Sequence, residues 1–288
     1  MKNLFLFAIS LSFLVACEEP VEIEIEGGES QLIVDAFLND LPQEQVISLA
    51  QSKEFFDKNQ QVPVLNADVK VTNSDGTVFQ FLDANQDGLY TWSGGTIIEE
   101  GKTYNLTISY NGELYTSEEL ANPVAPIDSL VIGPQDDQFG GGADADTGAY
   151  QIELFARDLS GREDYNWIRS YRNDTLNTDA GSINAVEEAG SVGSDGTLFI
   201  PPVRFFRLND FGRPYEFGET VKVQIWSINR NTFLFLNQVS NQINNGGLFA
   251  VPPSNVRTNI ESSSQEISKQ AVGYFSVSMV SEVEKVIQ

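Results

Sequence analysis

The side chains that could do chemistry are limited, because the chain of 288 residues has no histidine and a single cysteine, Cys17. Without histidine it cannot build a Ser-His-Asp site, a Cys-His site or a histidine-ligated zinc site. The remaining acids and bases are 41 Asp and Glu and 17 Lys and Arg side chains, together with tyrosines. A hydrolase that uses two carboxylates stays chemically open, but no spacing identifies the pair. We therefore expect a non-enzymatic protein that binds.

Two acidic segments could collect calcium. From Asp83 to Gly88, oxygen-bearing side chains alternate as in the first half of a calcium loop, but Gly94 stands where the bidentate glutamate is needed. A hairpin turn is the simpler interpretation. The Gly- and Asp-rich segment 133–148 is also more simply interpreted as a solvated loop; its acids include Asp136, Asp137, Asp144 and Asp146. We expect no cofactor, and at most weak calcium binding.

Aromatic residues offer two further candidate sites. Trp92, Trp167 and Trp226 could stack on the apolar face of a sugar, although tryptophans in strands usually belong to the core. The cluster Arg204-Phe205-Phe206-Arg207 follows two prolines and has the composition of a protein contact. A buried strand is the alternative interpretation of this cluster.

The amino terminus predicts export and lipidation. Lys2 precedes an apolar run that is too short to span a bilayer and that ends in Leu14-Val15-Ala16-Cys17. This ending resembles the bacterial lipobox, and lipidation also accounts for a lone cysteine in an exported protein. We expect a signal peptide at 1–16 and a lipid on Cys17. Several acyl chains anchor a protein stably, so the mature protein should stay on a membrane.

Charge bears on where the protein faces and on what it binds. Glu18 and Glu19 directly follow Cys17 and resemble the signal that sends Bacteroidota lipoproteins to the cell surface, while a solvated linker is the alternative. Residues 17–30 are expected to form a tether. The net charge of −24 repels phosphate backbones, so nucleic acid is not expected as a partner.

These sites must be positioned by a mostly β fold. Short alternating segments with regular turns, including the hairpin dipeptide Asn111-Gly112, predict an antiparallel sandwich over 31–122. The stretch from Asp68 to Tyr110 resembles immunoglobulin-like and transthyretin-like modules.

A second β-rich domain is expected over 127–288, after the stiff segment Asn122-Pro123-Val124-Ala125-Pro126. It should contain a helix near 231–245, where apolar residues follow a helical stripe, and a final strand over 271–283. Segments 133–148, 177–196 and 209–219 are expected to be long loops, and 255–268 a polar connection.

The order of these features resembles DUF4249, a family of Bacteroidota outer-membrane lipoproteins. The resemblance implies a partner, because members are commonly encoded beside TonB-dependent receptors, but it brings no catalytic residues. The segments that carry it are the lipobox, Leu32-Ile33-Val34-Asp35, Ala67-Asp68-Val69, Asp75-Gly76, Gly88-Leu89-Tyr90, Gly101-Lys102-Thr103-Tyr104, the Pro123/Pro126 break with Ile127-Asp128, the late helix, Pro253-Ser254-Asn255-Val256 and Gly273-Tyr274-Phe275.

Three functions stay open on this basis. The first is an accessory protein of a TonB-dependent transporter or a similar outer-membrane complex, and the second is a glycan-binding or adhesive surface lipoprotein. A hydrolase based on carboxylates is the third.

Overall fold

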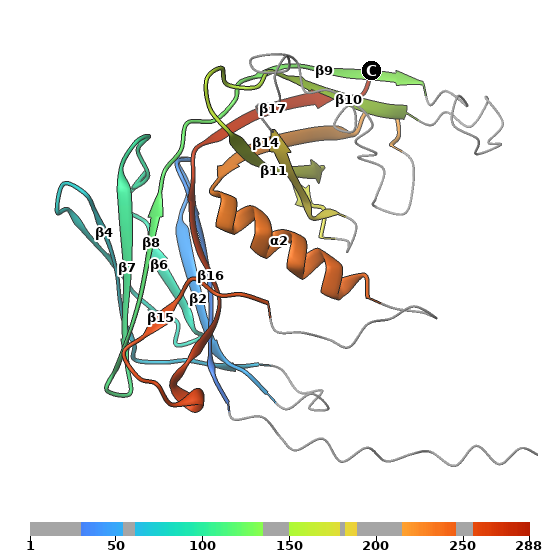
Figure 1. Ribbon diagram of the computed structural model, residues 1–288. Coiled ribbons are helices and arrows are strands. Elements are labelled where there is room, and N and C mark those ends of the chain that lie inside the picture. Colours follow the sequence, from blue (N-terminus) through green and yellow to red (C-terminus); the bar gives the residue numbers. More distant parts are fainter. Residues whose placement is uncertain (1–29, 54–60, 135–149, 179–181, 189–214, 246–255) are drawn as a thin grey trace, which may run out of the picture.

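The computed structural model describes residues 30–53, 61–134, 150–178, 182–188, 215–245 and 256–288. Over this part the mostly β prediction is confirmed: strands form four sheets, with one long helix, α2. Two of the sheets form a sandwich, and the other two form a second layered unit beside it (Figure 1). The predicted immunoglobulin-like or transthyretin-like character of the sandwich stays a prediction.

The sandwich encloses the largest apolar core. Residues that alternate along the strands, such as Val34, Ile47, Val71 and Ile108, are fully buried between its two sheets. One sheet, which we call the β1 sheet, contains β16 (Ala271–Ser278), β1 (Leu32–Asn39), β2 (Gln45–Gln51), β3 (Val62–Pro63) and β6 (Leu89–Trp92). The other, the β7 sheet, contains β15 (Glu261–Ser262), β8 (Glu113–Leu120), β7 (Thr103–Tyr110), β4 (Asp68–Asn73) and β5 (Val78–Phe81).

Two of these strands come from the far end of the chain, which the sequence pattern assigns to the second domain. β15 lies within the predicted polar connection and pairs with β8, whereas β16 pairs in parallel with β1. The predicted final strand over 271–283 is in fact two strands, because at Met279 the chain leaves the sandwich and continues as β17 (Val280–Val286) in another sheet. Alternation within a strand reports which face is buried but carries no information about the neighbouring strand.

The second unit is built on the β14 sheet. This sheet contains β12 (Thr175–Leu176), β11 (Asp164–Arg172), β14 (Thr220–Ile228), β17 and, paired with β11, β13 (Asn184–Glu188). The prediction of a long loop over 177–196 is therefore wrong in part, because residues 184–188 form strand β13. The hairpin of β9 (Ile127–Pro134) and β10 (Tyr150–Ala156) packs on one face of this sheet, where Leu130, Leu154, Val223 and Ile225 form a second core.

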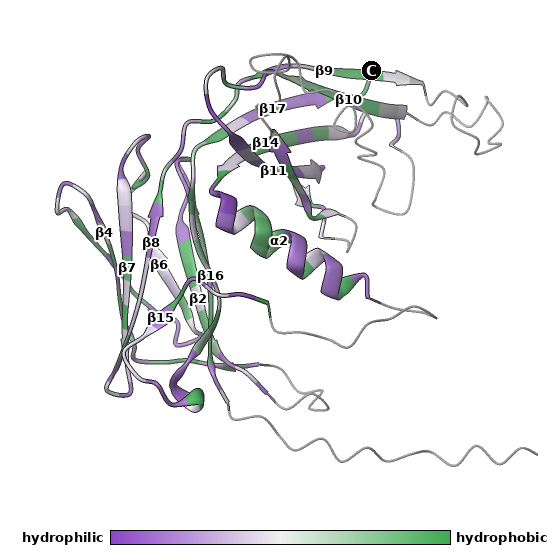
Figure 2. Ribbon diagram, in the orientation of Figure 1, coloured by the Kyte–Doolittle hydropathy of each residue, from purple (hydrophilic) through white to green (hydrophobic). Residues whose placement is uncertain are grey.

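The helix α2 (Arg230–Ile243) confirms the predicted late helix and lies in the corner between the β14 sheet and the β1 sheet (Figure 1). Its Thr232 and Leu236 are buried, and hydrophobic and hydrophilic stretches alternate along it (Figure 2). A short 3-10 helix, η5 (Ile267–Lys269), precedes β16. Within the described residues, no helix has the length and apolar character needed to cross a membrane.

Candidate functional site

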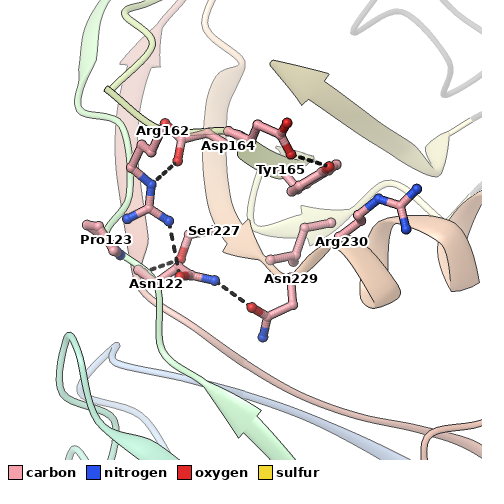
Figure 3. A pocket seen from close by; sticks show the side chains of 10 residues that line it. Asn122, Pro123, Arg162, Asp164, Tyr165, Ser227, Asn229 and Arg230 are labelled. Atoms are coloured by element: carbon pink, nitrogen blue, oxygen red, sulfur yellow. Dashed lines mark hydrogen bonds and ion pairs between the residues drawn. The ribbon is translucent and has the colours of Figure 1, made fainter. Parts of the chain in front are cut away.

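A cavity of about 230 Å³ lies at the junction of the two units (Figure 3). The segment after β8, the residues before and at the start of β11, and the turn from β14 into α2 converge there. Its lining is mostly polar and includes Asn122, Pro123, Arg162, Glu163, Asp164, Tyr165, Ser227, Ile228, Asn229 and Arg230.

Most polar groups of this cavity bond to one another. Asn122 accepts a hydrogen bond of 3.0 Å from the Arg162 guanidinium and donates one of 2.6 Å to the side-chain oxygen of Asn229 (Figure 3). The Ser227 hydroxyl donates to the backbone carbonyl of Asn122 at 2.6 Å. Arg162 forms an ion pair of 2.5 Å with Asp164. Burial raises the pKa of Asp164, and Arg162 opposes that shift.

Behind the cavity, Glu119 at the end of β8 connects three segments. Its two carboxylate oxygens accept hydrogen bonds from the side-chain amides of Asn229 and Asn259, the latter at 3.0 Å. The Tyr274 hydroxyl on β16 lies close by without completing a hydrogen bond of good geometry. Burial of Glu119, which is only 7% exposed, raises its pKa to about 7, although the bonds to these amides favour the charged form. Glu119 therefore joins the sandwich, the start of α2 and the carboxy-terminal segment.

The cavity gives little support to acid–base chemistry at this junction. Asp164 is committed to Arg162, and Glu163 accepts a hydrogen bond of 3.3 Å from the Tyr165 hydroxyl. A general acid or base needs a proton that substrate can reach, whereas both carboxylates are engaged with neighbouring residues of the 162–165 segment. The arrangement is suited to fixing the geometry of a scaffold.

A second cluster lies where α2 meets both units, and we call it the aromatic corner. It contains Trp167 and Trp226 from the β14 sheet, Phe37 and Tyr274 from the β1 sheet, and Phe235 from α2. The centroids of neighbouring rings are 4.5–6.4 Å apart, within the range of favourable aromatic pairs. Trp226 is 3% exposed, as the core interpretation predicts, whereas Trp167 is only partly buried.

Trp92, the third predicted tryptophan, lies apart from the corner. It packs edge-on against Phe79 with ring centroids 5.5 Å apart, and its indole N–H donates to the Gly95 carbonyl at 3.1 Å. The structure thus brings together two of the three tryptophans, and Trp92 belongs with the sandwich core.

The segment from Asp83 to Gly88 has the geometry of a turn. The Asp83 carboxylate accepts hydrogen bonds from the backbone N–H groups of Asp87 and Gly88, both at 3.1 Å. Asp87 in turn accepts from the backbone of Leu89 at 3.0 Å. These bonds stabilise a turn, as the sequence predicts, but the strands on its two sides, β5 and β6, belong to different sheets and are joined by the bridge between Leu82 and Thr91.

Several predicted sites lie outside the described residues. They are the lipidation site Cys17, the export signal Glu18 and Glu19, the candidate partner contact Arg204, Phe205, Phe206 and Arg207, and the acidic residues Asp136, Asp137, Asp144 and Asp146.

Sequence reasoning missed Glu119, Asn229 and Arg169, whose guanidinium carbon lies 4.7 Å from the ring centroid of Trp167. A signal existed for Arg169, because it follows Trp167 by two residues and alternation places both on one face of a strand. No local pattern marks Glu119 or Asn229, because the two residues that bond to each other are 110 positions apart in the sequence.

The segments that carry the family resemblance have structural roles where the structure describes them. The Tyr90 hydroxyl donates to the Val64 carbonyl and accepts from the Ala67 N–H, both at 2.9 Å, and Tyr104 ties down the loop before β7 in the same way. Gly273 has φ +98°, and a Cβ there would lie 1.9 Å from the Val34 carbonyl oxygen. These residues position strands and are not gathered in a reaction site.

Comparison with known proteins gives one match that carries weight. No curated protein matches the chain. The solved structure "Biofilm associated protein - BSP domain" is similar over 69% of this chain and 26% of its own, with 17% sequence identity and a TM-score of 0.20, too low to support an argument about fold or function. The family model "Domain of unknown function (DUF4249)" matches residues 18–284, nearly the whole sequence. The chain is therefore a member of the DUF4249 family.

Proposed function

We propose that this protein is a non-enzymatic lipoprotein that faces the exterior of the outer membrane and serves a TonB-dependent transporter, or a similar complex, as an accessory subunit. The observation that supports a binding role best is the set of hydrogen bonds at the junction of the two β units. Asn122, which follows β8, bonds to Arg162 and Asn229 of the second unit, and Glu119 of β8 also bonds to Asn229. A rigid scaffold of this kind suits a protein that presents a surface to a partner.

The proposed anchor adds to this role. Cys17 precedes Leu32, where β1 begins, by a segment that can extend over at most about 50 Å. A lipid on Cys17 would confine the folded units to the membrane plane and raise their effective concentration near an integral partner.

The proposed contact lies on the second unit. The cluster Arg204-Phe205-Phe206-Arg207 falls between β13 and β14 in the sequence, and both strands belong to the β14 sheet. Aromatic residues and arginine are enriched where protein interfaces bury their centres. An interface of ordinary size needs about 800 Å² from each partner.

A pull-down of the lipidated full-length protein in mild detergent, followed by mass spectrometry, tests this proposal. We expect a β-barrel receptor to co-purify with the wild type, and Cys17→Ala to release the protein from membranes. Phe205→Ser together with Phe206→Ser should reduce recovery of the receptor at least tenfold. Phe217→Ser is the matched control, because Phe217 is 75% exposed in the same unit.

Either of two results would count against the accessory role. One is the absence of any barrel protein in the wild-type pull-down. The other is equal recovery of the receptor with the double variant and with the Phe217 control, which would mean that the cluster does not make the contact.

The second candidate function is glycan binding at the cell surface. The aromatic corner favours it, because Trp167 keeps part of its surface beside a second tryptophan and a cationic side chain.

A further inference from the structure

The end of the sandwich at which β1 begins is the end that leads toward the predicted tether, and we call it the tether end (Figure 1). Strand pairing places the start of β16 and the end of β2 there. An ion pair of 3.1 Å between Lys269, just before β16, and Glu113, at the start of β8, brings the β7–β8 turn to the same end. The chain enters the second unit from the opposite end, after Leu120 of β8 and after Ser278 of β16.

Hydrogen bonds fix the start of the folded chain beside η5. The side-chain amide of Gln31 donates to the backbone carbonyl of Ile267 at 3.0 Å, and the Ser30 hydroxyl donates to the backbone carbonyl of Ser52 at 2.7 Å. Cys17 precedes Ser30 by a segment that extends over at most about 45 Å. A lipid on Cys17 would therefore keep η5 within that distance of the membrane.

Large apolar side chains are exposed at the tether end. Ile267 on η5 is 69% exposed, Leu82 is 61% exposed and Val62 is 55% exposed. Val62 begins β3 beside the end of β2, and Leu82 follows β5 where its partner β4 begins. Within the described residues these are three of the four most exposed large hydrophobic side chains, and the fourth, Phe217, belongs to the second unit. Scattered apolar side chains are ordinary on a protein surface, but their gathering at one end indicates a contact surface.

The loop that carries η5 is braced on both sides. The Ser262 hydroxyl donates to the Lys269 carbonyl at 2.6 Å, and the side-chain amide of Gln270 donates to the Ser264 carbonyl at 2.6 Å. A braced loop loses little conformational entropy when it makes a contact. Ile267 is thus presented to solvent in a fixed position.

Acidic side chains at this end are engaged by neighbouring groups. The Asp83 carboxylate accepts two backbone hydrogen bonds, Asp68 pairs with Lys70 at 2.5 Å, and Glu113 pairs with Lys269. Paired carboxylates repel a lipid headgroup less than free ones do. The net charge of −24 still opposes a strongly anionic surface, so the surface that fits this end consists of zwitterionic headgroups.

We propose that the tether end is a membrane-contacting surface, on which Ile267, Leu82 and Val62 enter the headgroup layer of the bilayer that holds the Cys17 lipid. The inference rests on the lipid anchor of the proposed function and adds an orientation to it. Apolar side chains bind where headgroups meet acyl chains, and the anchor raises the local concentration of lipid, so a weak contact suffices. The second unit then stands away from the membrane, beyond the length of β1, which is roughly 26 Å for its eight residues.

Hydrogen–deuterium exchange of the full mature chain tests this contact. Cys17 is the only cysteine, so its thiol can be coupled to a maleimide phospholipid in phosphatidylcholine vesicles. The reference is the same chain with Cys17 blocked by N-ethylmaleimide and mixed with the same vesicles. We expect the amides of residues 82–88 and 263–270 to exchange at least threefold more slowly in the coupled protein. Residues 74–77, in the turn at the opposite end, should exchange equally in both samples.

Two matched serine variants identify the contact residue. Ile267→Ser should remove the slowing at residues 263–270. Val78→Ser is the control, because Val78 is 52% exposed at the opposite end of the sandwich, and it should leave the slowing unchanged. Both side chains are exposed, so melting temperatures close to that of the wild type should show that both variants are folded.

The outcomes separate the contact from the anchor. Equal exchange in the coupled and the blocked wild type would overturn the contact and leave the anchor standing, because the coupling is chemical. Slowing that is equal at both ends, or that survives Ile267→Ser, would also overturn it. If Cys17→Ala stayed on membranes in cells, the lipid anchor would fail, and the contact would lose its basis with it.

Discussion

At the scale of single residues, Glu119 illustrates how a buried carboxyl can couple the stability of this fold to pH. It is nearly inaccessible, and the groups that reach it are the amides of Asn229 and Asn259 and the Tyr274 hydroxyl. None of these groups is cationic, so they stabilise the carboxylate less than an ion pair would. Burial therefore dominates, and its pKa rises from the ordinary 4.5 to about 7.

Glu119→Gln should remove this pH dependence. A raised pKa means that the folded state binds the proton more tightly than the unfolded state. The contribution of Glu119 to stability is therefore largest below pH 4.5 and is lost as the pH rises through about 7, by about 3 kcal/mol in total. Unfolding by urea between pH 4.5 and 8 should show that fall in the wild type and a flatter profile in Glu119→Gln.

Glu118→Gln is the natural control, because Glu118 is the exposed neighbour on the same strand. It should keep the wild-type profile. Parallel profiles for the wild type and Glu119→Gln would mean that Glu119 is as well solvated as Glu118.

The residues of the aromatic corner show which part of a site the sequence can reveal. The alternation of Trp167, Arg169 and Tyr171 already places three side chains on one face of a strand. That Phe37, Tyr274 and Phe235 complete the corner depends on how α2 and two sheets pack, and no local pattern encodes that packing.

At the scale of elements, strand positions were predictable, and strand partners were not. Alternating or continuous apolar residues in the sequence predict strands over 32–38, 103–110 and 221–228. β1, β7 and β14 confirm these predictions within one residue at each end. The parallel partner of β1 lies more than 200 residues away in β16. The motif Gly273-Tyr274-Phe275 in β16 indicates that another backbone passes close to the glycine. It does not identify that backbone as the one of β1.

Gly273→Ala should therefore be among the most damaging single changes in the chain. The new Cβ would collide with the carbonyl of Val34, and the positive φ disfavours any side chain. We expect little folded protein, measured as soluble yield and as the circular dichroism of the β signal.

Gly95→Ala gives the matched comparison, because its φ of +99° is nearly the same while no atom lies within 4 Å of the position that a Cβ would take. Backbone strain alone costs about 1 kcal/mol, so this variant should fold with a lower melting temperature. If Gly273→Ala and Gly95→Ala lost similar amounts of folded protein, the cause would be the positive φ and not the contact with β1.

At the scale of the whole molecule, the two units are interlocked. The chain passes from the sandwich to the second unit after β8, returns before β15, and leaves again at Met279. Predicted boundaries at 122 and 127 mark the first passage, but linear boundaries cannot describe a chain that passes between its units three times.

A fragment ending at residue 126 should consequently fail to form a stable sandwich. It lacks β15 and β16, and with them the buried Ile260, Ala271, Phe275 and Val277 of the first core. Each large apolar side chain contributes roughly 1.5–3 kcal/mol when buried, so the loss approaches the stability of an ordinary domain. We expect no cooperative thermal transition for residues 30–126.

Adding residues 256–279 to this fragment through a flexible linker should restore a transition. Cooperative melting of the shorter fragment, at a temperature close to that of the full chain, would show that the sandwich is independent of the carboxy-terminal strands.

The parallel alignment of β1 and β16 also determines how the molecule resists tension. The amino-terminal end of β1 leads toward the predicted tether, and the carboxy-terminal end of β16 leads through Met279 into the β14 sheet. A pull between membrane and second unit would draw these neighbouring strands lengthwise in opposite directions. The ladder from Leu32–Ala271 to Asn39–Ser278 is then loaded in shear, so its hydrogen bonds share the force and do not open one at a time. A strand more than 200 residues further along the chain thus completes the joint that would carry the mechanical load.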